Sequence, residues 1–263
     1  MRNAVLLLLA SFALALAVAA SACGESKSNA GLFSDSDGGV YLALGDSVAA
    51  GSGASDGNAT SYVGLVDKAL RERLGDGLEL RSLAAGGHTT QDLIDDELPA
   101  ALAALRDRNV RLITITIGGN DLNILQSSPD AAACVADVSD PKCPVAGILA
   151  DTEQRLDSIL GTLRDAAAPD TRIVIQVYPN LFSGTGHPFE KAAGMAFGKL
   201  DDVIARAAAA NDVRIADPRA AFEGKGGELT HTLDPTPDFH PNDAGHRAIA
   251  DAFLEVLGLS TPD

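Results

Sequence analysis

The stretch Leu112-Ile113-Thr114-Ile115-Thr116-Ile117 decides the fold of this chain, because it consists almost entirely of β-branched residues. Such side chains favour extended backbone, and a run without charged residues is typical of a strand that is covered on both faces. Strands of this kind belong to parallel sheets that lie between two layers of helices. The stretch therefore predicts the central strand of an α/β protein.

Other strands and helices alternate along the chain on both sides of this stretch. Apolar, β-rich runs predict strands at Val40–Leu44, Leu78–Leu83, Arg111–Ile117, Arg172–Tyr178 and Val213–Ala216. Helical spacing of apolar positions predicts helices at Tyr62–Leu74, Gln91–Arg106, Ile148–Ala167, Phe189–Ala210 and Asp243–Leu257. This order predicts a three-layer α/β/α sandwich with a five-stranded parallel sheet.

Polar and glycine-rich segments follow the predicted strands. Ser47 comes directly after the first strand, Gly87 follows the second, Asn120 the third and Tyr178-Pro179-Asn180 the fourth. In parallel sheets, ligands bind where the carboxyl ends of the strands meet. We therefore expect the functional site at this edge of the sheet.

The N-terminus has the pattern of a secretory signal peptide. Arg2 supplies a positive charge, Val5–Ala20 is almost continuously apolar, and small residues then precede Cys23. The apolar region is too short for a spanning helix. We expect residues 1–22 to be removed, and no second apolar stretch of the sequence is long enough to span a bilayer.

The small residues before Cys23 resemble the cleavage site of bacterial lipoproteins, in which the cysteine becomes the lipid-bearing N-terminus. Ordinary signal-peptidase cleavage after Ala22, or a free thiol, are the alternatives. Residues 23–39 are rich in Ser, Gly and Asp and predict a flexible tether, and residues 40–258 are long enough for one α/β domain. We expect an exported protein of the cell envelope, anchored in the membrane by the lipid or released.

Cys134 and Cys143 lie close together in a proline-containing, loop-like segment. An exported chain meets an oxidising compartment, so a local disulfide is the expected pairing. Two unpaired thiols are the alternative, and a zinc site is disfavoured because no histidine lies nearby in the sequence. We expect neither a metal ion nor a cofactor.

The formal net charge of -16 at pH 7 excludes nucleic acid as a plausible partner, because phosphates would be repelled. The same charge disfavours adsorption to anionic lipid headgroups. Contact with a membrane is thus expected only through the N-terminal lipid, and we expect a monomer.

Four short blocks of this sequence, taken together, resemble the SGNH hydrolases of the GDSL esterase/lipase superfamily. They are Gly45-Asp46-Ser47-Val48, Gly87 within Ala85–Thr90, Gly118-Gly119-Asn120-Asp121 and His240-Pro241-Asn242. The blocks stand in the family's order and span the region from Val40 to Leu257. The resemblance implies a flavodoxin-like SGNH hydrolase fold, and the cysteine pair after the third block is similar to that of secreted members.

A serine at the end of a strand, in a glycine-flanked turn, presents its hydroxyl to a cleft, and Ser47 is therefore the expected nucleophile. By resemblance, the oxyanion hole would combine the backbone N–H groups of Ser47 and Gly87 with the side-chain amide of Asn120. The alternatives are a helix-capping serine, a simple turn glycine and a turn-capping asparagine. Gly86 leaves the second position ambiguous by one residue.

His240 is the expected general base, because Asn242 can cap the last helix and hold the imidazole at its entrance. The family usually places the orienting Asp three residues before the histidine, but Pro237 occupies that position here. Asp238, two residues before, is the expected orienter. Asp234 or a backbone carbonyl in a serine–histidine dyad remain alternatives.

Four further histidines are not expected to do chemistry. We place His246 in a helix, for packing or on the surface, His187 and His231 in loops, and His88 beside the cleft.

Together these residues predict a serine hydrolase that cleaves carboxylic esters through an acyl-Ser47 intermediate. The substrate would be a small-molecule, lipid or glycan ester, and segments Asn123–Ala146 and Asn180–Pro188 would rim its cleft. Two alternatives remain: a non-catalytic envelope protein that binds acyl or glycan ligands, and an acyltransferase that uses the same site.

Overall fold

The computed structural model describes residues 38–260, except 124–129, 131–132, 135–136 and 237. The signal peptide, Cys23 and nearly all of the expected tether lie outside the described residues. Within the described part, no helix combines the length and the apolar character that crossing a bilayer requires.

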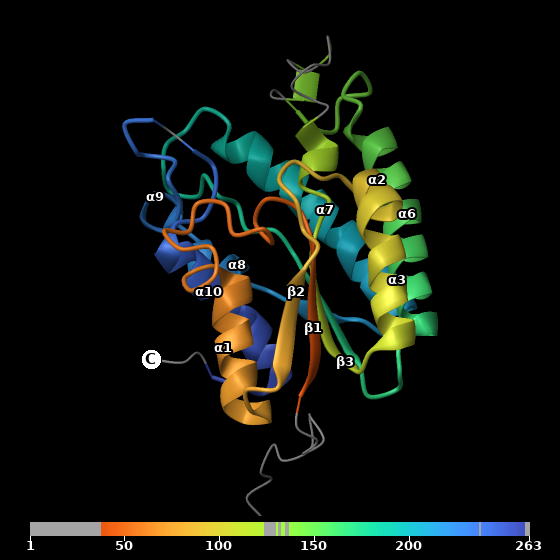
Figure 1. The fold of residues 1–263 in the computed structure, drawn as a ribbon. Helices are drawn as coiled ribbons and strands as arrows, with labels where there is room; N and C mark the ends of the chain where they lie inside the picture. The colour runs from red at the N-terminus through yellow and green to blue at the C-terminus, as the bar shows by residue number, and fades with distance from the viewer. Residues whose placement is uncertain (1–37, 124–129, 131–132, 135–136, 237, 261–263) are drawn as a thin grey trace, which may run out of the picture. The chain divides into compact units, whose positions relative to one another are not determined.

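A five-stranded parallel sheet forms the centre of the domain (Figure 1). In spatial order, its strands are β2 (Leu78–Ser82), β1 (Gly39–Gly45), β3 (Val110–Thr116), β4 (Arg172–Gln176) and β5 (Arg214–Ala216). Every neighbouring pair is parallel, and Leu44 of β1 lies opposite Ile115 of β3. The predicted five-stranded parallel sheet is confirmed.

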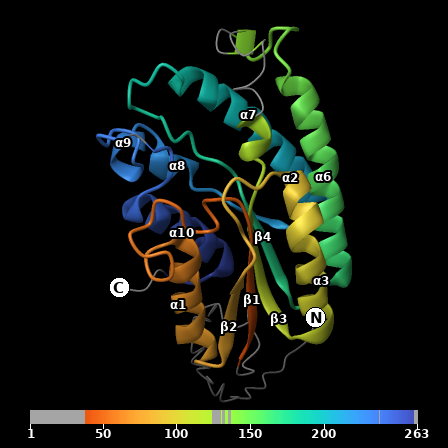
Figure 2. The same ribbon diagram turned by 45° about the horizontal axis from the view of Figure 1, so that its top comes forward.

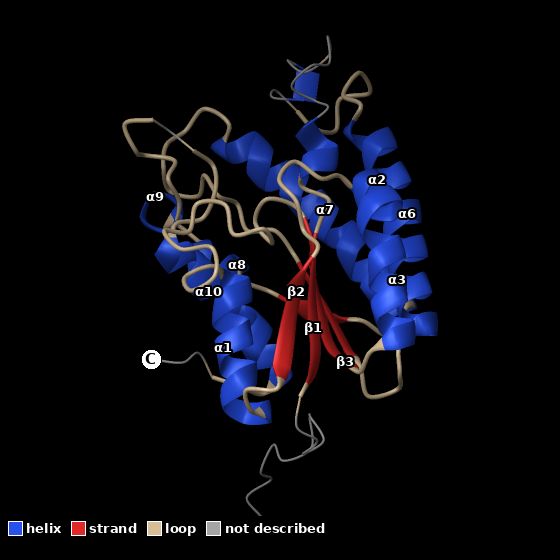
Figure 3. Cartoon of the chain, viewed as in Figure 1, coloured by secondary structure: helices blue, strands red, loops and turns tan. Residues whose placement is uncertain are grey.

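Helices cover both faces of this sheet (Figures 2 and 3). They are α1 (Tyr62–Leu74), α2 (Thr90–Asp92), α3 (Leu98–Asp107), α6 (Val145–Ala166), α7 (Glu190–Ala210), α8 (Arg219–Phe222), α9 (Gly226–Leu229) and α10 (Asp243–Leu257). A π-helical turn, η1 (Leu93–Glu97), joins α2 to α3, and a 3₁₀ turn, η2 (Asn120–Asn123), follows β3. The predicted α/β/α architecture is confirmed.

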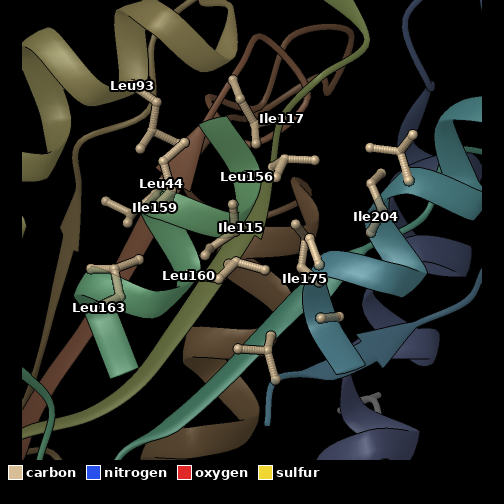
Figure 4. Packing of buried hydrophobic residues seen from close by; sticks show 14 of the residues in the cluster. Leu44, Leu93, Ile115, Ile117, Leu156, Ile159, Leu160, Leu163, Ile175 and Ile204 are labelled. Atoms are coloured by element: carbon tan, nitrogen blue, oxygen red, sulfur yellow. The ribbon is translucent and has the colours of Figure 1, made fainter. Parts of the chain in front are cut away.

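Every residue of β3 is buried, as expected for a central strand. Its side chains alternate between two apolar clusters, since Ile113 and Ile115 pack in the cluster that contains residues of α6 and α7, while Leu112 packs in the one that contains residues of α1 and α10. Figure 4 shows Ile115 in the first cluster, beside Leu156, Leu160 and Ile175. Thr114 and Thr116 face the second cluster, where their hydroxyls hydrogen-bond to buried tyrosine hydroxyls at 2.8 Å. The threonines therefore enter the core without leaving an unpaired hydroxyl.

Residues Gln91–Arg106 do not form the single helix that their spacing predicts. The N–H of Leu98 donates to the carbonyl of Leu93, five residues back, so the chain makes a π-helical turn before α3 begins. Pro99 lies in the first turn of α3, where its missing N–H is tolerated, whereas within one long helix it would interrupt the hydrogen bonding. The extra residue in this turn places Glu97 in the interior, 2% exposed.

Two short helices, α8 and α9, were not predicted, and the other differences concern element ends. Gly39 pairs with Leu78, so β1 begins one residue earlier than predicted and includes the last residue assigned to the tether. Helix α6 begins at Val145 instead of Ile148, and β4 ends at Gln176 instead of Tyr178. These shifts leave the carboxyl ends of β1 and β3 where the site was expected.

Candidate active site

The turn after β1 holds Ser47 at the carboxyl edge of the sheet. Gly45 has a φ of 127°, and a Cβ there would lie 2.0 Å from the carbonyl oxygen of Thr116, so only glycine fits beside β3. The N–H of Asp46 donates to that same carbonyl oxygen at 2.8 Å, which ends the strand pairing. The chain then turns away and presents the partly exposed Ser47.

The imidazole of His240 lies against this serine, with its Nε2 atom 2.8 Å from Ser47 Oγ. Helix α10 holds the histidine in place, because Asn242 caps that helix by accepting the Gly245 N–H at 3.1 Å. The predicted cap is confirmed. Two residues separated by most of the domain's sequence thus meet at hydrogen-bonding distance.

Asp238 contacts the other nitrogen of this imidazole, with Oδ1 2.5 Å from His240 Nδ1. A carboxylate only accepts hydrogen bonds, so Nδ1 carries a proton and Nε2 is left as the acceptor for the Ser47 hydroxyl. Burial raises the pKa of Asp238, but hydrogen bonds from the backbone and imidazole of His240 outweigh it, and the net shift is downward. Asp238 is therefore ionised at neutral pH.

Asp234 does not reach His240, because its carboxylate pairs with a different histidine. Its Oδ2 atom lies 2.6 Å from Nδ1 of His231, whose Nε2 lies 2.8 Å from the carbonyl oxygen of Gly53. Both partners are acceptors, so His231 satisfies them together only as an imidazolium. The hydrogen bond to Gly53, followed by that to Asp234, raises the pKa of His231.

The remaining histidines lie apart from the Ser47–His240 contact. His246 is fully buried within α10, where Nδ1 accepts the Tyr62 N–H at 3.3 Å. His187 packs against Phe182 in a tilted arrangement, with ring centroids 4.7 Å apart. His88 lies beside the second block, with its Nδ1 2.8 Å from a carboxylate oxygen of Glu97.

The two other expected oxyanion donors lie on segments that are tied to each other. Gly87 has a φ of 83°, and no atom lies within 4 Å of the position that a side chain would occupy. The amide of Asn120 donates to the carbonyl oxygen of His88 at 3.0 Å. A side-chain amide carries two N–H groups. This hydrogen bond uses one of them and orients the Asn120 amide, and the second N–H is left for the expected oxyanion.

Asp46 is a buried acid that the sequence interpretation left without a role. Its Oδ1 accepts the Val48 N–H at 2.9 Å, and its Oδ2 accepts the hydroxyl of Tyr178. Burial raises its pKa to about 6, although the hydrogen bonds from Tyr178 and from the backbone oppose the shift. The sequence shows that Asp46 lies beside Ser47. It does not show that Asp46 pairs with Tyr178, which follows a strand far away in the sequence.

A cavity of about 630 Å³ opens beside Ser47 and His240. Apart from the polar groups at the Ser47 end and Asn123, the side chains that line it are apolar or aromatic, and they include Leu122, Val138, Leu181, Phe182, Phe189, Ala192, Ala193, Ala196, Phe197 and Phe239. Phe189 and Phe239 are 48% and 45% exposed. The site is therefore an apolar cavity with a polar end and exposed aromatic rings.

The two segments expected to rim the cleft both contribute to this cavity, the first through Asn123, Cys134 and Val138 and the second through Leu181 and Phe182. Part of the first segment lies outside the described residues. Cys134 and Cys143 form a disulfide with their Cα atoms 4.9 Å apart, as predicted. The bond closes the loop that supplies one wall of the cavity.

Across the part of the chain that is described, no three His, Cys, Asp or Glu side chains come together as a metal site would require. The chemistry available at this edge is that of a hydroxyl, an imidazole, a carboxylate and backbone or amide N–H groups. This is the set that acyl transfer through a serine uses.

Comparison with known proteins agrees with the geometry. The lipase of Streptomyces rimosus is 26% identical over 246 residues, covering 84% of this chain and 86% of that protein. The crystal structure of phospholipase A1 from Streptomyces albidoflavus NA297 superimposes with a TM-score of 0.61 at 26% identity, covering 84% of this chain and 98% of the other. Axe2, an acetylxylan esterase from Geobacillus stearothermophilus, shares the fold with a TM-score of 0.58 at 20% identity, covering 88% and 99%.

A model of the GDSL-like lipase/acylhydrolase family matches residues 43–248. The match includes the turn of Ser47, the segments of Gly87 and Asn120, and the loop of Asp238 and His240. The match spans well over half of the chain. The family consists of lipases and acylhydrolases. The chain belongs to the GDSL-like lipase/acylhydrolase family and is a carboxylic ester hydrolase.

Proposed function

We propose that Ser47, His240 and Asp238 carry out the ester hydrolysis of this chain as nucleophile, general base and orienting acid. The observation that supports this most directly is the 2.8 Å contact between Ser47 Oγ and His240 Nε2. Hydrogen-bond reach between nucleophile and base is what proton transfer requires. The carboxylate of Asp238 on the opposite nitrogen then stabilises the imidazolium that forms.

The reaction has two halves. Ser47 Oγ attacks the ester carbonyl carbon while His240 Nε2 takes the hydroxyl proton, and the resulting tetrahedral intermediate expels the alcohol, which receives that proton. Water then attacks the acyl-Ser47 ester, giving its proton to His240, and the second intermediate collapses to the free acid and Ser47. No further reactant is needed.

The negative oxygen of both intermediates would be held by the N–H groups of Ser47 and Gly87 and by the free N–H of the Asn120 amide. The open space at Gly87 and the orientation of Asn120 by His88 support this assignment. A donor of this kind typically lowers the barrier by about 3 kcal/mol. The backbone N–H groups are neutral, so they stabilise the oxyanion without bringing a further negative charge beside it.

The cavity favours a lipid ester with a long acyl chain over an acetylated glycan. An acetyl group would leave most of a 630 Å³ apolar space unfilled, whereas each buried methylene of a longer chain contributes about 0.8 kcal/mol. The small residues Ala192, Ala193 and Ala196 leave room along α7 for such a chain. A glycan would find few polar groups in this wall.

The test is hydrolysis of p-nitrophenyl esters from acetate to palmitate, combined with labelling by a fluorophosphonate. We expect a fluorophosphonate label on Ser47 and the highest kcat/KM for acyl chains of about eight carbons or more, a length that the cavity can hold. Ser47→Ala should lose both the label and the activity. Ser52→Ala, in the same turn, is the matched control and should remain active. A folded parent that takes no label would support the non-catalytic binding protein instead.

We also propose that the chain is exported and anchored through a lipid on Cys23. The support is the order of charge, apolar run, small residues and cysteine at the N-terminus. Expression in a bacterial host with labelled palmitate should give a labelled membrane-bound protein. Cys23→Ser should lose the label, and a parent that is never labelled would contradict the proposal.

A further inference from the structure

Glu97 is a buried carboxylate that connects the turn of Ser47 to the segment of Gly87. It ends the π-helical turn η1 and is 2% exposed. Its Oε2 accepts the backbone N–H of Gly45 at 2.7 Å, and its Oε1 accepts Nδ1–H of His88 at 2.8 Å. One side chain thus satisfies two donors, one at the end of β1 and one on the segment that follows β2.

These two donors stand next to the groups that the proposed mechanism uses. Gly45 lies two residues before Ser47 and fixes where the nucleophile turn leaves the sheet. His88 directly follows Gly87, and its carbonyl oxygen accepts the amide of Asn120 at 3.0 Å. A continuous chain of hydrogen bonds therefore runs from the nucleophile turn through Glu97 and His88 to Asn120.

Stability alone is a poor reason for a carboxylate at this place. Burial raises the pKa of Glu97, the hydrogen bonds from His88 and Gly45 lower it, and the nearby Asp46 carboxylate adds repulsion. Replacing a buried ionic contact with packed apolar groups is often neutral or stabilising. What an apolar residue does not supply is two directed acceptors at fixed positions.

We propose that Glu97 is a positioning residue that sets the distance between the nucleophile of Ser47 and the oxyanion donors of Gly87 and Asn120. The inference rests on the roles proposed above for those three residues. Oxyanion stabilisation depends on donors held within tenths of an ångström of the developing charge, and an error of 1 Å can cost about 100-fold in rate. Glu97 contacts no reacting atom, so it acts through Gly45 and His88.

The test compares Glu97→Gln with His88→Ala and with the double variant. We expect each single change to lower kcat by about 10- to 100-fold while KM stays within about threefold, because the donors act on the transition state. The double variant should be no slower than the slower single variant, since both changes break the same connection. Asp96→Asn, an exposed acid of the same turn, is the matched control and should keep full activity.

A second readout separates positioning from a loss of folded protein. An alkyl boronic acid forms a tetrahedral adduct on the serine, so its inhibition constant should rise in parallel with the loss of kcat/KM. The affinity for the product fatty acid should change less than about threefold. If Glu97→Gln does not fold, His88→Ala carries the test, because its side chain is partly exposed.

The outcomes distinguish this inference from the function on which it rests. A parent that is inactive and unlabelled on Ser47 would overturn both. A parent whose activity is lost in Ser47→Ala, together with Glu97→Gln and His88→Ala variants of unchanged kcat, would overturn the positioning role alone. Additive losses in the double variant would also contradict it.

Discussion

Oδ1 of Asp238 accepts two hydrogen bonds from the same residue, His240: one from its backbone N–H at 3.1 Å and one from Nδ1 at 2.5 Å. The first bond is the Asx-turn contact, in which an aspartate side chain accepts the N–H two residues later. A spacing of two residues therefore lets the turn itself aim the carboxylate. The backbone of His231 closes the loop, donating to the His240 carbonyl and accepting from the Asp238 N–H, each at 3.1 Å.

Asp238→Asn should lower kcat by roughly 10²- to 10⁴-fold with little change in thermal stability. The amide oxygen can still accept the backbone N–H and keep the turn, but a neutral amide does not stabilise the imidazolium of His240. Steady-state kinetics on a p-nitrophenyl ester, together with a thermal melt, measures both effects. A folded variant with unchanged kcat would favour a serine–histidine dyad.

Asp234→Asn is the matched control for that change, because Asp234 pairs with His231 in the same loop. Its kcat should fall by less than about threefold, because the carboxylate of Asp234 contacts His231 and not the proposed general base. A loss as large as that of Asp238→Asn would mean that the two carboxylates exchange partners.

Asp46→Asn should gain stability relative to the parent as the pH rises from 4 to 7. The pKa of Asp46 is about 6 in the folded protein and about 3.9 unfolded, so the folded parent holds this proton more tightly and loses stability as the proton leaves. The difference in unfolding free energy between variant and parent should therefore grow by roughly 2 kcal/mol over this range. Urea unfolding of both proteins at each pH measures it.

Asp92→Asn provides a control of opposite sign. Hydrogen bonds from the Thr89 side chain and backbone lower the pKa of Asp92, so its stabilising contribution appears above the unfolded pKa and is lost on acidification. This variant should become less stable relative to the parent as the pH rises. The same sign for both variants would contradict the burial argument for Asp46.

Ala193→Phe should shift the preferred ester toward short acyl chains. Ala193 lines the cavity on α7, and a phenyl ring there would occupy space that a long chain needs, while acetate would still reach Ser47. We expect kcat/KM for the decanoate ester to fall by about tenfold or more, each excluded methylene being worth about 0.8 kcal/mol. The acetate value should stay within about threefold.

Ala209→Phe, on the exposed end of the same helix, adds the same ring away from the cavity. Its chain-length profile should match that of the parent. If the two variants gave equal profiles, the acyl chain would bind elsewhere.

Removing both cysteines of the disulfide, as Cys134→Ala with Cys143→Ala, should lower the free energy of unfolding by about 2–3 kcal/mol, because the unfolded chain regains the freedom of a short loop. A thermal melt measures the change. Reductant should destabilise the parent and leave the double variant unaffected, and equal effects on both would exclude the bond.

Local sequence patterns were sufficient for the sheet and for most of the helices. The β-branched run of β3 and the apolar spacing of α1, α7 and α10 reflect which residues of each element are buried. This periodicity can be recognised from residues that are close together in the sequence. The exception is the segment Gln91–Arg106. There the spacing predicts one helix, but a proline and a backbone bond to Leu93 produce a π-helical turn, which periodicity does not encode.

The sequence by itself determined the parallel sheet, the edge at which the polar blocks gather, and the candidate residues Ser47, Asn120 and His240. Only the tertiary structure decided which carboxylate faces which histidine, and that Glu97 turns inward to the strand ends. The physical reason is that strand and helix formation follow from local side-chain burial. The direction of a carboxylate depends on the turn that carries it and on donors brought from distant segments.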